Sequence, residues 1–296
     1  MTRKTEIDAL GAFLLIFCSA SMGINQTLVK IVNSGLQPVF QAGLRSACAF
    51  LPVLLFAVLM RRKLSLTDGS FWPGMLVGGL FSAEFLFVFQ AVEYTTVSRA
   101  SIFFYTMPFW TAILAHFLIP GERLTRIRVL GLVLAIMGVV LALYNNQYPA
   151  SERSYVGDFY CLLAASLWAA IVIVTRTTKL SGSSPEMQLL YQLAVSAIVL
   201  LSVASFFGEL VRELNSTIIF LFSIQVLFVV CVGFLTWFWV LSIYPASNMA
   251  SFSFLAPVFG VIFGWLILNE TLEKTILISL LLVSIGVILV NRKSLR

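Results

Sequence analysis

Charge is scarce in this sequence. Only 11% of the 296 residues are Asp, Glu, Lys or Arg, whereas 60% are hydrophobic, and the mean hydropathy is +0.99. Most of such a chain cannot face water, so a soluble globular protein and a disordered one are both excluded. The composition predicts an all-α integral membrane protein, with the lipid bilayer as a partner.

The residues on which most enzymes depend are also missing. The single histidine, His116, lies in an apolar span without a convincing nucleophile and acid around it, so a packing role is the favoured interpretation. The four cysteines lack metal-ligand spacing, and no GxxxxGK[ST] phosphate loop is present. We therefore expect no enzyme activity, no metal, no cofactor and no ATP site on this polypeptide.

Long apolar runs recur along the chain with only short connections between them. A membrane-spanning helix needs about 20 residues to cross a hydrocarbon core of ~30 Å. We predict ten transmembrane helices, at residues 9–29, 38–60, 72–92, 98–119, 129–144, 159–178, 187–207, 218–243, 250–268 and 276–290.

The net charge of +6 has an explanation in membrane topology. Basic residues concentrate in the loops that share one side if the N-terminus is inside, around residues 61–63, 123–128 and 176–179 and at the C-terminus. The positive-inside rule then places both termini in the cytoplasm. The membrane expected is the inner or plasma membrane of the cell. Nucleic acid is not expected as a partner, because the membrane accounts for the surplus of positive charge.

The sequence contains an internal repeat. Aligning Pro108 with Pro257 places SRASIFFYTMPFWTAILAHFLIPGERLTRIRVLGLVLAIMGVVL over SNMASFSFLAPVFGVIFGWLILNETLEKTILISLLLVSIGVIL, and one gap then matches Glu122 to Glu270. Each copy is an apolar span with an internal proline, a short polar break and a second apolar span. Each proline should bend its helix, because it removes a backbone hydrogen bond.

The repeat divides the chain into two related halves, residues 1–148 and 149–296. Each half holds five predicted spans, and an odd number inserts the second half upside down relative to the first. Glu122 is then expected inside and Glu270 outside. Two inverted five-helix repeats are a common build of secondary transporters, which hold the substrate near the midplane between the repeats.

The doubled motifs resemble a known family. PFWTAILAHFLIPGERLT with GxxLAIMGVVL, and PVFGVIFGWLILNETLE with LLLVSIGVIL, are similar to the EamA-type exporters of the drug/metabolite transporter superfamily, across both halves. Length and aromatic-rich spans are most similar to the YddG-like exporters of aromatic and other neutral amino acids. The resemblance implies a basket in which spans one to four and six to nine surround a central cavity, with spans five and ten outside it.

Two residues of opposite charge fall well inside predicted spans, away from the span ends. Arg45 lies in the second span and Glu84 in the third, both slightly toward the external side, so their side chains can meet. A charge at that depth is costly unless it is paired or faces water. Either the two form a buried ion pair that fixes two helices, or they orient the carboxylate and the ammonium of a zwitterionic substrate. Gln192 takes the position of Arg45 in the second half.

Polar and aromatic residues supply the remaining site candidates. Gln26 either makes a helix-to-helix hydrogen bond or lines the cavity together with Trp168, from the corresponding region of the second half. Phe85 shares the face of Glu84, and Trp237 lies on the matching face in the second half, so both are candidate walls of an apolar cavity, although packing is the alternative. Tyr105 stands beside the expected bend and can present its hydroxyl there.

The favoured function is a secondary transporter that exports small organic solutes, above all aromatic and other neutral amino acids. It would work by alternating access through a cavity between the repeats. Export of other metabolites, drugs or cations is the alternative, and a lipid-modifying enzyme or a membrane protein without a transport cycle is less favoured. The sequence is compatible with both proton-coupled transport and passive uniport. It is also compatible with both a monomer and a homodimer.

Overall fold

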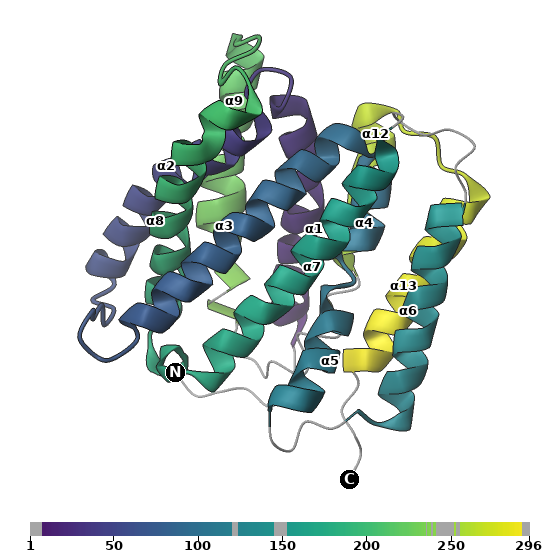
Figure 1. Cartoon of the computed structure of the whole chain (residues 1–296), viewed down its shortest axis with the longest axis horizontal. Helices are drawn as coiled ribbons and strands as arrows, with labels where there is room; N and C mark the ends of the chain where they lie inside the picture. Colours follow the sequence, from purple (N-terminus) through teal and green to yellow (C-terminus); the bar gives the residue numbers. More distant parts are fainter. Residues whose placement is uncertain are drawn as a thin grey trace.

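The structure is a computed structural model that describes residues 8–119, 124–144, 153–234, 236–237, 239–240, 252 and 255–291. Within these ranges the regular structure is helical, apart from one isolated antiparallel bridge between Leu36 and Val211. The helices run alongside one another as a bundle (Figure 1). The predicted all-α class is therefore confirmed for the described part of the chain.

Every predicted span overlaps at least one described helix. In the described part of the chain, seven helical stretches are long and apolar enough to cross a membrane, counting α4 with α5, α8 with η2 and α9 with η3. α12 and α13 are shorter apolar helices. In chain order the elements are α1 (Ala9–Val32), α2 (Pro38–Leu59), α3 (Phe71–Tyr94), α4 (Val97–Phe104), α5 (Met107–Leu118), α6 (Arg126–Tyr144), α7 (Ser154–Thr177), η1 (Lys179–Gly182), α8 (Pro185–Ala204), η2 (Ser205–Phe207), α9 (Ser216–Ile224), the π-helical η3 (Gln225–Phe234), α12 (Leu255–Leu268) and α13 (Lys274–Asn291).

Polar side chains begin several of these helices. The side chains of Asp8, Thr96, Ser184 and Asn215 each accept a hydrogen bond from a backbone N–H in the first turn of the helix that follows. The first backbone N–H groups of a helix have no acceptor within the helix, so such caps give these donors a hydrogen-bond partner. At these four helices, the sequence at the end of the apolar run therefore sets where the helix begins.

The fourth predicted span is broken at the position where its proline stands. α4 ends at Phe104 and α5 begins at Met107, so Pro108 lies in the first turn of α5. Proline is well placed there, because its missing N–H would have no partner in a first turn. The expected bend at Pro108 is confirmed as a break that leaves Tyr105 and Thr106 between the two helices.

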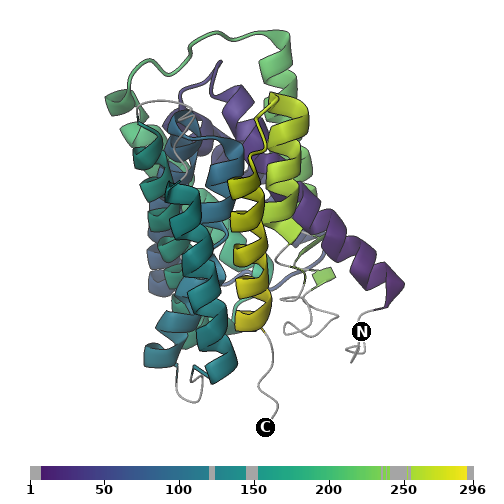
Figure 2. The ribbon, with the colours of Figure 1, turned by 90° about the vertical axis from the view of Figure 1, so that its right-hand side faces the viewer.

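Helices from the two sequence halves interlock. α2 packs along α8, α3 along both α7 and α8, and α1 against α12. α6 and α13 pack on each other at one edge of the bundle, facing the viewer in Figure 2. Their backbones approach closely there, because a Cβ atom at Gly286 would lie 2.6 Å from the carbonyl oxygen of Gly131. This outer pair is the arrangement expected for the fifth and tenth spans.

Candidate functional site

Two opposite charges are buried between α2 and α3. The Arg45 side chain, on α2, belongs to a residue only 2% exposed, and Glu84, on α3, is 0% exposed. A buried charge is costly unless hydrogen bonds and an opposite charge compensate it. The partners of each group therefore decide what the pair can do.

Arg45 is held by side chains of α1 and α3. Its Nη1 donates a hydrogen bond of 3.1 Å to Oδ1 of Asn25. Its guanidinium carbon lies 4.4 Å from the ring centroid of Phe85 and 4.8 Å from that of Phe89. Aromatic ring faces carry partial negative charge, so two of them stabilise a desolvated cation. The guanidinium is thus fixed in place without a bond to Glu84.

Glu84 has no hydrogen-bond partner among the residues that the structure describes. Both of its carboxylate oxygens are buried and accept no hydrogen bond from the described residues. Arg45 and Glu84 attract each other electrostatically, yet neither an ion pair nor a hydrogen bond joins them in the described part of the chain. Within the described ranges Glu84 is therefore a buried acceptor without a donor, near an arginine that Asn25 and two phenylalanines hold.

A pair of buried glutamines lies one turn from Arg45. Nε2 of Gln41, on α2, donates a hydrogen bond of 3.1 Å to Oε1 of Gln225, at the start of η3. Oε1 of Gln41 and Nε2 of Gln225 have no partner among the described residues. Gln41 and Arg45 are four residues apart and share a helix face. We call Asn25, Gln41, Arg45, Glu84 and Gln225 the polar cluster.

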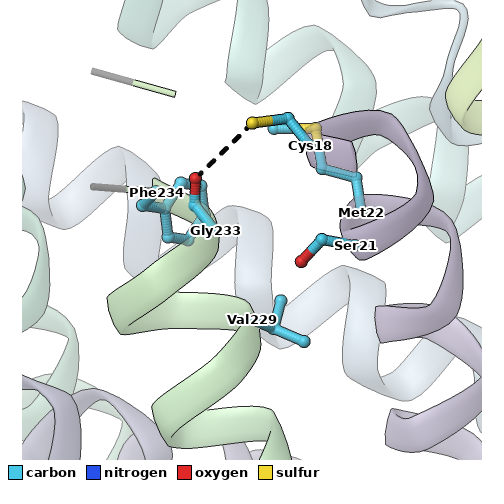
Figure 3. Close-up of a pocket in the computed structure, with 6 residues that line it drawn as sticks. All are labelled: Cys18, Ser21, Met22, Val229, Gly233 and Phe234. Carbon is cyan, nitrogen blue, oxygen red and sulfur yellow. Dashed lines mark hydrogen bonds between the residues drawn. The ribbon is translucent and has the colours of Figure 1, made fainter. Parts of the chain in front are cut away.

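A small pocket lies between α1 and η3. Figure 3 shows side chains of the two helices facing each other across it. The thiol of Cys18 lies 3.9 Å from the carbonyl oxygen of Gly233, and Oγ of Ser21 has no hydrogen-bond partner within the described ranges. Ser21 stands four residues before Asn25, so the pocket is one turn of α1 from the polar cluster. The pocket residues are Cys18, Ser21, Met22, Val229, Gly233 and Phe234.

The second wall of the pocket belongs to a π-helical segment, Gln225–Phe234, which continues α9. Runs of i to i+5 hydrogen bonds are rare, and they occur frequently at functional sites. Here the π-helical segment supplies both Gln225 of the polar cluster and Gly233 of the pocket. Polar cluster and pocket are thus two neighbouring parts of one interface.

The structure gathers three of the eight predicted site residues, Arg45, Glu84 and Phe85. Gln26 lies elsewhere, and its Oε1 accepts a hydrogen bond of 2.8 Å from Oγ of Ser101 on α4. A Cβ atom at Gly260 would lie 2.0 Å from that hydroxyl oxygen, so α1, α4 and α12 meet tightly at this point. The observed interaction of Gln26 is the helix-to-helix hydrogen bond.

The remaining four candidates are spread over the bundle. Trp237 is half-buried and packs against Leu15 and Val240, in a different apolar cluster from Phe85. Trp168 and Gln192 are half-buried on α7 and α8. Tyr105 is buried at the end of α4, with its ring against Phe104. Their roles as substrate-binding residues stay predictions.

Sequence reasoning missed three members of the polar cluster, Asn25, Gln41 and Gln225. Gln41 had a usable signal, because it is a polar residue one turn before the only arginine placed deep in a span. Asn25 stands beside Gln26 but points its amide at a different neighbour, Arg45. No pattern in the sequence pairs Gln225 with Gln41, which is far away along the chain.

Sequence reasoning also missed a buried ion pair where α4 begins. Arg99 bonds to Asp158 on α7, and both residues are less than a tenth exposed. Oγ1 of Thr95 donates a hydrogen bond of 2.8 Å to the same carboxylate, and Nη1 of Arg99 donates one of 2.7 Å to the carbonyl oxygen of Ala142. The pair ties α4 to α6 and α7.

Glu270 caps α4 from the loop between α12 and α13. Its carboxylate accepts hydrogen bonds from the backbone N–H groups of Val97 and Ser98, at 2.6 and 2.9 Å, and from Oγ of Ser98 at 2.6 Å. A negative charge at a helix N-terminus is stabilised by unpaired N–H groups and the helix dipole. Glu122, its repeat partner, lies outside the described residues.

Replacing Glu270 with alanine should destabilise the protein by about 2 to 4 kcal/mol, because a hydrogen bond to a charged group contributes about 1.5 to 3 kcal/mol. Thermal unfolding in detergent measures this, with Glu209→Ala as the control, since Glu209 is exposed. Equal unfolding temperatures for the two variants would show that the cap contributes nothing.

Comparisons with known proteins agree with this architecture. The profile described as "EamA-like transporter family" matches residues 9–144 and 155–292. The "Uncharacterized transporter YvbV" of Bacillus subtilis (strain 168) is 28% identical, over 98% of this chain and 93% of its own. The "Probable amino-acid metabolite efflux pump" of Escherichia coli (strain K12) is 26% identical, over 97% and 94%. A solved crystal structure shares the fold, with a TM-score of 0.68 at 17% identity over 96% of this chain and 98% of its own.

Proposed function

Because the chain belongs to the EamA-like transporter family, we propose that it is a secondary transporter that exports neutral amino acids, those with aromatic or aliphatic side chains above all. That family consists of membrane transporters of small metabolites rather than enzymes. Two similar proteins, from Escherichia coli and Salmonella typhimurium, are named probable amino-acid metabolite efflux pumps, which supports the amino-acid class.

One observation carries the choice of substrate. Arg45 and Glu84 are buried opposite charges that attract each other and yet make no bond to each other. A zwitterion fits this arrangement, because its ammonium would donate the hydrogen bonds that Glu84 lacks among the described residues. Its carboxylate would lie against the guanidinium of Arg45. Charge-assisted hydrogen bonds of this kind are among the strongest in proteins. Together these two contacts fix the amino-acid head group.

Apolar groups surround the position where the side chain of the substrate would lie. Phe85 packs between Phe81 and Phe89 in the stripe that carries Glu84. The pocket between α1 and η3 lies one turn of α1 away, with Met22, Val229 and other apolar groups in its wall. Ring-bearing and branched side chains bury well against such surfaces. This neighbourhood supports an exporter of aromatic and aliphatic amino acids.

Competition by analogues of one transported amino acid tests the head-group assignment. The parent amino acid should inhibit uptake of its labelled form into proteoliposomes, whereas the matching amide and the deaminated acid, each lacking one charge, should inhibit at least tenfold more weakly. Equal inhibition by an amine without a carboxylate would instead indicate an exporter of organic cations, which Glu84 and the ring of Phe85 could also accommodate.

The proposal includes the membrane architecture. Ten spans arranged as two inverted five-helix repeats, residues 1–148 and 149–296, would move against each other around the polar cluster, in alternating access. α1 begins and α13 ends toward the same end of the bundle (Figure 2), which is compatible with both termini on one side. We assign that side to the cytoplasm and the protein to the plasma membrane, because basic residues gather in the loops there.

Cysteines at Thr67 and Glu209 should be labelled from opposite sides of the membrane. Both residues are exposed, Thr67 in the loop between α2 and α3 and Glu209 in the loop before α9. In a cysteine-free background, an impermeant maleimide added to intact cells should label Glu209→Cys, and Thr67→Cys only after the cells are permeabilised. Labelling of both from outside, or the reverse pattern, would contradict the predicted orientation.

A further inference from the structure

Two loops from different halves of the chain pair at one end of the bundle. The loop between α1 and α2 meets the loop between η2 and α9, beside the label α9 in Figure 1. The backbone N–H of Gln37 donates to the carbonyl oxygen of Leu210 at 3.0 Å, and that of Arg212 donates to the carbonyl oxygen of Gly35 at 2.9 Å. These two hydrogen bonds flank the antiparallel bridge between Leu36 and Val211.

Arg212 strengthens the pairing with its side chain. Its Nη1 donates to the carbonyl oxygen of Asn33 at 2.9 Å and forms an ion pair of 2.6 Å with Glu93 at the end of α3. The side chains of Arg212 and Glu93 remain 36% and 28% exposed. We call residues 33–37, residues 210–212 and Glu93 the loop clasp.

The loop clasp stands in line with the polar cluster. Gln37 precedes Gln41 by four residues, and Gln41 precedes Arg45 by four, so each is one turn, or about 6 Å, further along α2. The first turn belongs to the clasp, the second carries the buried hydrogen bond from Gln41 to Gln225, and the third carries Arg45. Two layers that join the halves therefore separate Arg45 from this end of the bundle.

The loop clasp is held together by weak contacts. Its contacts are a few loop hydrogen bonds and a half-exposed ion pair, which is weaker than the buried helix packing around it. One strand of the clasp is reached through Gly208, whose φ of 108° lies in a region that favours glycine, and a Cβ there would meet no other atom within 4 Å. Such an element has a low free energy of local opening, which is a property that gates and lids require.

We propose that the loop clasp is the gate that closes the substrate pathway at the α9 end of the bundle, with the bond between Gln41 and Gln225 as its inner layer. The inference rests on the proposed function, because a gate implies a pathway through the polar cluster. Opening breaks the contacts that join residues 33–37 and Glu93 to residues 210–212 and parts the two glutamines. The substrate site then reaches the solution on that side.

A disulfide across the clasp tests whether it must open. Leu36 and Val211 form a non-hydrogen-bonded antiparallel pair, in which Cα atoms lie about 4.5 Å apart, within the range of about 4.4 to 6.8 Å that disulfides accept. In a cysteine-free background, Leu36→Cys with Val211→Cys should lose at least nine-tenths of its transport on oxidation and regain it on reduction. The matched controls are the two single cysteine variants under the same oxidant.

Access to the inner layer supplies a readout that needs no substrate. Arg212→Gln should raise, at least fivefold, the rate at which an impermeant maleimide added on the clasp side labels a cysteine at Gln41, and Arg212→Lys should give an intermediate rate. Arg62→Gln is the control, because it breaks an ion pair, 2.9 Å long, between a half-exposed arginine and the buried Glu186, outside the clasp. It should leave the labelling rate unchanged.

The outcomes separate the gate from the proposed substrate. The gate is overturned if the cross-linked protein transports as fast as the same protein after its disulfide is reduced. An unchanged labelling rate in Arg212→Gln also overturns it. Increased labelling in Arg212→Gln supports the gate even if no amino acid is transported, in which case the proposed substrate fails alone.

Discussion

The double variant Arg45→Gln with Glu84→Gln is expected to insert and purify normally yet to transport a zwitterionic amino acid roughly 10- to 100-fold more slowly. A hydrogen bond to a charged group contributes about 1.5 to 3 kcal/mol, and each 1.4 kcal/mol is about tenfold in affinity. The double variant keeps a polar side chain at both positions but loses both charges that would hold the head group. Transport in liposomes at matched protein density measures the effect.

The single variants separate binding from folding. Arg45→Gln or Glu84→Gln alone leaves one buried charge without its opposite, which should destabilise the protein by several kcal/mol. The double variant should recover most of that stability without recovering transport. Arg62→Gln with Glu186→Gln, which removes a pair outside the polar cluster, should keep the parental rate. If the Arg45 and Glu84 double variant also transports at the parental rate, the two charges serve the scaffold alone.

Asp158→Ala is expected to cause the largest loss of stability, about 3 to 5 kcal/mol, which is the usual cost of breaking a buried ion pair. Arg99 would keep its charge among buried groups and lose its anion, and Oγ1 of Thr95 would lose its acceptor. Unfolding in detergent measures the loss.

Two comparisons make the Asp158 result interpretable. Replacing both Arg99 and Asp158, with methionine and leucine, should recover much of the lost stability, because no unpaired charge remains. Glu93→Ala breaks a half-exposed pair and should cost about 1 kcal/mol or less. A loss for Asp158→Ala as small as that for Glu93→Ala would show that Arg99 is solvated or has other sufficient partners.

The helices were the predictable part of this protein. Hydropathy and helix caps act over neighbouring residues, so the apolar runs predicted where helices lie, and Pro108 predicted the break between α4 and α5. The π-helical segment was not predictable in the same way. Its sequence, QVLFVVCVGF, is as apolar as any ordinary span, and the change in hydrogen-bond register carries no signature there.

The candidate site was predictable only in part. Arg45, Glu84 and Phe85 could be found because a charge inside an apolar span is conspicuous and its helix neighbours follow from periodicity. Gln26 was chosen as a lone glutamine inside a span, and Trp237 by aligning the two halves. Alignment identifies equivalent positions but not the neighbours that pack there, and the structure places these two side chains against Ser101 and Leu15 respectively.

Counterflow in proteoliposomes tests the central claim most directly. Vesicles that contain the purified protein are loaded with an unlabelled neutral amino acid and diluted into a trace of the labelled form, with protein-free vesicles and the Arg45 and Glu84 double variant alongside. The account predicts that the label accumulates transiently above its equilibrium level only with the parental protein, and most strongly for aromatic and aliphatic amino acids. Failure of every neutral amino acid to exchange, in vesicles whose protein is folded and correctly inserted, would contradict it.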